Sequence, residues 1–72
     1  MSSTQQAGGQ IDFAEAARQL EMAAHDARVA VSCIGLGDLD GAHTHAILAR
    51  AAADGAQNLL QAALASGEKI PS

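Results

Sequence analysis

The sequence predicts an all-α protein, an antiparallel two-helix hairpin that dimerises into a four-helix bundle. Three observations lead to this fold class: alanine is the most frequent residue, Pro71 is the single proline, and apolar residues recur at helical spacing on both sides of a glycine-rich segment. Alanine has the highest helix propensity and proline the lowest, so helix is favoured almost throughout. We place one helix at residues 12–34, a turn at 35–41 and a second helix at 41–66.

The first helix has a start signal and a regular apolar stripe. Asp12 and Glu15 form a capping-box-like pair, in which the first carboxylate accepts backbone N–H groups at the helix start. Gly35 suits the left-handed conformation that ends a helix. The stripe advances in alternating steps of four and three residues, which keeps it against a packed neighbour. Its members are Phe13, Ala17, Leu20, Ala24, Ala27, Val31 and Ile34.

The second helix returns beside the first because the connection is short. Asp40, or alternatively Asp38, is expected to cap its start, and Gly67 to end it before Pro71. Residues 11–67 thus form the hairpin. A disordered N-terminal tail at 1–10, where two adjacent glycines and polar residues show no apolar periodicity, precedes it, and a C-terminal tail at 68–72 follows.

A homodimer is predicted because the hairpin offers more apolar surface than one helix pair uses. A chain of this length buries only about 60% of its unfolded surface, and Cys33 has no second cysteine with which to form an intramolecular disulfide. The second helix is apolar over more than half of its circumference, and Gly55 would let another helix come close. The predicted dimer interface is Leu48, Ala52, Gly55, Leu59 and Ala62.

A further strip on the first helix is the predicted docking surface for a heterologous protein. Met22, Asp26, Val29 and Cys33 recur at helical spacing almost opposite the apolar stripe. Methionine suits an adaptable binding surface. The alternative interpretation is that these are scattered apolar residues of the kind that any protein surface has.

We consider Cys33, His43 and His45 as candidates for catalysis or metal binding, because the turn brings their segments close together. A Cys–His pair can form a thiolate nucleophile, and the three side chains are metal-ligand types. However, no third orienting residue is evident, and His43 and His45 diverge by about 200° on a helix. A calcium loop is excluded because Leu36 and Ile47 would occupy its first and last ligand positions. We therefore expect no enzyme activity, no metal site and no cofactor.

The net charge and the hydropathy of the sequence limit the classes of partner that we expect. The net charge is −4, and the four cations Arg18, Arg28, Arg50 and Lys69 are dispersed, so nucleic acid is not expected. No apolar run is long enough for a membrane span and residues 1–10 lack the features of a signal peptide, so a cytoplasmic location is predicted.

The predicted function is that of a non-catalytic interaction module. It would be a small dimeric helical adaptor or inhibitor that occludes a larger regulatory protein, as a phage-encoded inhibitor of a host regulator does. Two alternatives stay open: an antitoxin-like small regulator, and a metal or small-molecule sensor that uses Cys33, His43 and His45.

Overall fold

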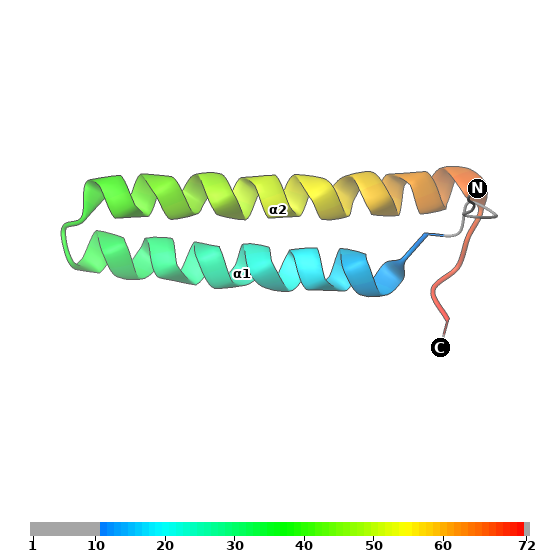
Figure 1. The fold of residues 1–72 in the computed structure, drawn as a ribbon, viewed down its shortest axis with the longest axis horizontal. Coiled ribbons are helices and arrows are strands. Elements are labelled where there is room, and N and C mark those ends of the chain that lie inside the picture. Colours follow the sequence, from blue (N-terminus) through cyan, green and yellow to red (C-terminus); the bar gives the residue numbers. More distant parts are fainter. Residues whose placement is uncertain (1–10, 72) are drawn as a thin grey trace, which may run out of the picture.

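The structure, a computed structural model, describes residues 11–71 and consists of two helices. Helix α1 spans Phe13–Gly35 and helix α2 spans Leu39–Ser66. They lie antiparallel and side by side along their length (Figure 1). The prediction of an all-α hairpin is confirmed for this part of the chain. The predicted tail at 1–10 lies outside the described residues. Neither helix has a stretch long and apolar enough to cross a lipid bilayer.

Helix α1 begins as the sequence predicts, with half of the capping box formed. Asp12 Oδ1 accepts a hydrogen bond from Glu15 N at 3.1 Å. The Glu15 carboxylate does not return to the Asp12 backbone: it accepts from Gln19 Nε2 at 2.8 Å and forms an ion pair with Arg18. The backbone N–H of Ile11 donates to Glu68 Oε1 at 3.0 Å, which ties the start of α1 to the end of α2.

The turn is tighter than predicted, and Gly37 rather than Gly35 takes the left-handed conformation. Gly35 is the last residue of α1, whereas Gly37 has φ of 73°. The N–H of Gly37 donates to Ile34 O at 3.1 Å and that of Asp38 donates to Cys33 O at 2.8 Å, the bonding pattern of a Schellman motif. This pattern needs a left-handed residue at position 37, where glycine has no Cβ to clash.

Asp38, the second of the two predicted caps, starts helix α2. Its Oδ1 accepts from Gly41 N at 2.9 Å, so α2 begins two residues before the predicted position. The predicted C-cap is confirmed: Gly67 has φ of 71°, and Glu68 N donates to Ala63 O at 2.9 Å. Residues 36–38 alone therefore connect the two helices.

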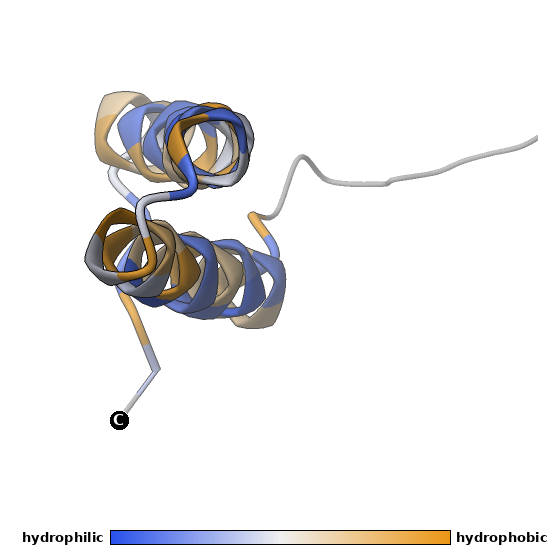
Figure 2. Ribbon diagram, turned by 90° about the vertical axis from the view of Figure 1, so that its left-hand side faces the viewer, coloured by the Kyte–Doolittle hydropathy of each residue, from blue (hydrophilic) through white to orange (hydrophobic). Residues whose placement is uncertain are grey.

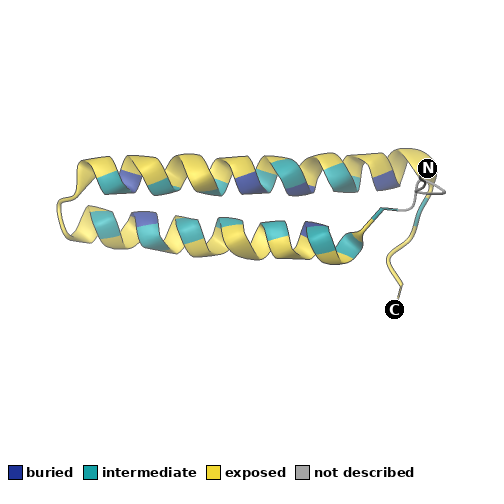
Figure 3. Ribbon diagram, in the orientation of Figure 1, coloured by how far each residue is buried: buried dark blue, intermediate teal, exposed yellow. Residues whose placement is uncertain are grey.

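The core between the helices is built almost entirely from alanine. Figure 3 shows that the buried and half-buried positions lie where α1 and α2 face each other. No side chain larger than alanine is fully buried within residues 11–71. We call the facing positions the interhelical seam. In α1 they are Ala16, Gln19, Ala23, Asp26, Ala30 and Cys33, and in α2 they are Ala42, His45, Ala49, Ala52, Ala56, Leu59 and Ala63.

The predicted packing stripe of α1 is wrong by one residue. Each member of the stripe directly follows a position of the interhelical seam or its extension, which rotates it about 100° away from α2. Val31 is 67% exposed and Ile34 is 70% exposed. Two adjacent rows of the helix share the same spacing, and the row of small residues lets the backbones approach more closely. Periodicity alone cannot choose between such rows.

Candidate interaction surfaces

The apolar stripe of α1 and several apolar residues of α2 lie on one side of the hairpin, where they line three hollows. Leu20 lines a hollow of about 480 Å³ together with Leu60 and Leu64. Ile34 lines another with Leu39, and Phe13 a third with Leu60. We call this surface the open face. Its large members are Phe13, Leu20, Val31 and Ile34 from α1 and Leu39, Leu60 and Leu64 from α2.

The open face has large side chains towards its ends and alanines between them. Leu39 and Leu64, near opposite ends of α2, are 80% and 81% exposed. In the end-on view of Figure 2, apolar positions appear on the outside of both helices as well as between them. The side chains that define the face are apolar, although Arg50 lies two heptads before Leu64 on α2 and Asp38 and Glu68 line two of the hollows. The intervening small residues are Ala17, Ala24, Ala27, Ala46 and Ala53.

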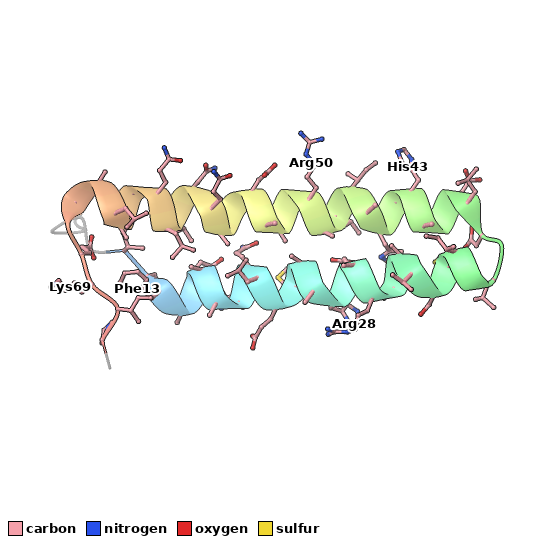
Figure 4. The ribbon with its side chains drawn as sticks, turned by 180° about the vertical axis from the view of Figure 1, so that it is seen from behind. Phe13, Arg28, His43, Arg50 and Lys69 are labelled. Carbon is pink, nitrogen blue, oxygen red and sulfur yellow. The ribbon has the colours of Figure 1, made fainter. Side chains whose placement is uncertain are left out.

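Polar and charged side chains lie beside this face, on the outer sides of the two helices. Figure 4 shows Arg50 and His43 projecting from the side of α2 that faces away from α1, and Arg28 projecting from the outer side of α1. Arg50 is paired loosely with Asp54 on its own helix, at 3.9 Å between Nε and Oδ2. Polar side chains next to apolar ones are also found at the rims of protein–protein contacts.

The predicted docking strip of α1 is divided between surface and interior. Met22 is 49% exposed and Val29 is half-buried at the edge of the interhelical seam. Asp26 lies in that seam, where the Nδ1 of His45 donates a hydrogen bond to its Oδ1 at 2.9 Å. Cys33 also points toward α2, since a Cβ added to Gly41 would lie 3.0 Å from its Sγ. The four residues therefore do not form one exposed strip.

The predicted dimer seam of α2 is divided in the same way. Leu48 and Ala62 are exposed, whereas Ala52 is buried against α1 and Leu59 is half-buried. A Cβ added to Gly55 would lie 3.6 Å from Gln19 Oε1, so this glycine faces α1 within the same chain. Only the two ends of the predicted seam are free to meet another molecule.

The three residues considered for metal binding or catalysis are not gathered at one point. His43 projects outward from α2 (Figure 4), whereas His45 and Cys33 face the interhelical seam. Across the described residues, no three side chains of the metal-ligating types come close enough to hold an ion. His45 is already occupied by its bond to Asp26.

No family model, curated protein or solved structure matches this chain. The sequence predicted that the α1 part of the open face packs against a neighbouring helix and did not predict that it is exposed within the hairpin. The signal for this surface was present in the sequence, because the Phe13–Ile34 stripe is wholly apolar while the row that faces α2 includes Gln19 and Asp26. A helix with two adjacent seams of that spacing can pack against two neighbours.

Proposed function

We propose that this chain is a non-catalytic protein-interaction module that works by burying its open face against another helical surface. In this role the chain acts as a small helical adaptor or inhibitor that occludes a larger protein. A cytoplasmic setting belongs to the same proposal, because a reducing compartment keeps the unpaired Cys33 thiol free.

The exposure of the open face is the observation that supports this proposal most directly. Val31, Ile34, Leu39 and Leu64 lie on the same side of the hairpin, and each is more than 60% exposed. Full burial of one such side chain stabilises an assembly by about 1.5–3 kcal/mol. Several large apolar side chains gathered on one side of a small protein are typical of an interaction site rather than of scattered surface residues.

The opposite side of the hairpin supports an adaptor rather than a purely self-associating protein. Met22 and Leu48 each precede a position of the interhelical seam by one residue, so they lie on the side away from the open face. Both are exposed. Met22 lines a hollow with Arg18, Glu21 and His25, a mixed surface that suits a heterologous partner.

Cysteine footprinting tests the proposal. In a Cys33→Ala background, Val31→Cys places a thiol on the open face, and Ser32→Cys places a matched thiol on the next, exposed residue of α1. In the cells that produce the protein, we expect a maleimide to label the Val31→Cys variant several-fold more slowly than the Ser32→Cys variant. Equal labelling rates for the two variants, both in cells and in concentrated purified protein, would contradict the proposal.

A further inference from the structure

Helix α1 has a second packing row, and all of its members except the half-buried Phe13 are exposed. The row Phe13, Ala17, Leu20, Ala24, Ala27, Val31 and Ile34 keeps the alternating four-and-three spacing over the whole helix. Leu20 is 46% exposed, and Val31 and Ile34 more so. Knobs-into-holes packing requires this spacing from each helix of a pair. The open row can therefore receive a helix of the same type.

A second copy of α1, running antiparallel, fits this row layer by layer. In one register, Ala17 lies opposite Ile34 of the second copy, Leu20 opposite Val31, and Ala24 opposite Ala27. Each layer then occurs twice about a twofold axis, as an isologous contact requires. Small side chains meet at the centre, where the helices approach most closely, and larger ones fill the layers on either side.

The charges beside the row select this register among its neighbours. Glu21 and Arg28 lie seven residues apart at the margin away from α2, and neither joins an ion pair within residues 11–71. In the register above, Glu21 faces Arg28 of the second copy, and the pair occurs twice. A shift of one heptad in either direction would instead set Glu21 or Arg28 against its own counterpart.

Parallel pairing lacks the same complementarity. In a parallel pair, residues at the margin of one helix meet the opposite margin of the other. Glu21 and Arg28 would then face Ala16 and Ala23, which already lie against α2. Opposite-charge contacts across the margin are the usual determinant of helix orientation in such pairs.

We propose that the occupant of the open face is a second copy of this chain, with the two α1 helices antiparallel and Glu21 of each facing Arg28 of the other. This inference rests on the proposed function, because it names the partner that covers the same surface. It also accounts for Leu20, Val31 and Ile34, the large side chains of α1 that a single hairpin leaves exposed.

Charge reversal tests the register. Glu21→Arg and Arg28→Glu each replace two attractive contacts by two repulsive ones, and we expect each to raise the dimer dissociation constant roughly tenfold. The double variant Glu21→Arg/Arg28→Glu restores opposite charges and should return the constant to within about threefold of the wild type. Sedimentation velocity over a concentration series measures all of these, with circular dichroism to check helix content.

Mixing the two single variants gives a sharper result. One copy then has arginine at positions 21 and 28 and the other has glutamate at both, so all contacts in a mixed dimer are attractive. We expect the mixture to associate at concentrations where each variant alone is a monomer. The control Asp54→Arg reverses a charge on α2 outside the row and should leave association unchanged.

Three outcomes would overturn the inference: a wild-type protein that remains monomeric at high micromolar concentration, single variants that dimerise like the wild type, or a mixture that gains nothing. These failures are distinct from failure of the proposed function. If Val31→Cys is protected in cells while the purified protein is monomeric, the module binds a different protein and the second copy is excluded.

Discussion

Two glycines two residues apart have different tasks at the turn. A Cβ added to Gly35 or Gly37 would meet no atom within 4 Å beyond the adjacent residues and the backbone of the same helix. Only Gly37 has a positive φ, whereas Gly35 lies in the last turn of α1. The position of the turn is therefore fixed by backbone conformation at one residue and not by crowding.

Alanine substitution separates these two roles. We expect Gly37→Ala to lower the free energy of unfolding by about 1 kcal/mol, because the left-handed conformation disfavours a Cβ. Gly35→Ala should raise it by about 0.4–1 kcal/mol, because alanine fits the helix and restricts the unfolded chain. Urea unfolding at fixed protein concentration measures both. If Gly35→Ala instead lowered the free energy of unfolding and Gly37→Ala raised it, position 35 would be the one that needs the left-handed conformation.

Also at the residue scale, Asp26 and His45 form a polar pair inside a seam that is otherwise mostly alanine. The 2.9 Å bond joins α1 to α2 near the turn end of the hairpin. A hydrogen bond between half-buried groups adds little net stability, but an unpaired group at the same place is costly. The pair therefore favours the observed rotation of α1, because any other rotation would separate its two members.

At the scale of single helices, each helix has more than one row that could pack. In α1 the row that faces α2 and the row of the open face are adjacent and share the same spacing. The alanines of the first row permit close contact between the two backbones, and the polar residues in it have partners across or along the helices. The more apolar row is left outside.

Substitution of Gly55 by alanine tests whether this side of α2 contacts another molecule. A Cβ at this position would make ordinary contact with Gln19, at 3.6 Å from Oε1 and 3.8 Å from Cδ. We expect Gly55→Ala to raise the free energy of unfolding by up to about 1 kcal/mol through helix propensity. Thermal unfolding followed by circular dichroism measures this. If Gly55 instead serves close approach between chains, the same substitution should weaken association.

At the scale of the whole molecule, one hairpin has little in its core to hold it together. The buried residues are all alanine, and many of the large apolar side chains are exposed, several of them on the open face. Burial free energy grows with the apolar area removed from water, so these alanines contribute much less than the exposed leucines and isoleucines could. Stability should therefore depend on what covers the open face.

Thermal unfolding at several concentrations shows this dependence. If folding and association are linked, each tenfold rise in protein concentration should raise Tm by about 3–5 °C. A Val31→Glu/Ile34→Glu variant puts charges on the open face and should unfold at a lower Tm that does not change with concentration. A wild-type Tm that is constant over a hundredfold range would show that the hairpin is stable alone.

Local features of this chain were predictable because their causes lie within a few residues. Asp12 at the start of α1, the connection between residues 34 and 42, and Gly67 at the end of α2 each follow from capping and turn chemistry. The open-face row was also visible as a pattern. Its exposure was not, because an exposed row and a packed row have the same period in the sequence.

The sequence by itself determined that the chain forms two helices, where they begin and end to within a few residues, and that they return antiparallel. The tertiary structure alone decided which sides face each other. A rotation of about 100° exchanges two rows of equal period, and the choice depends on contacts between distant residues, such as Asp26 with His45 and Gly55 with Gln19. That rotation also decides that most of the Phe13–Ile34 row is exposed and does not form the core of the hairpin.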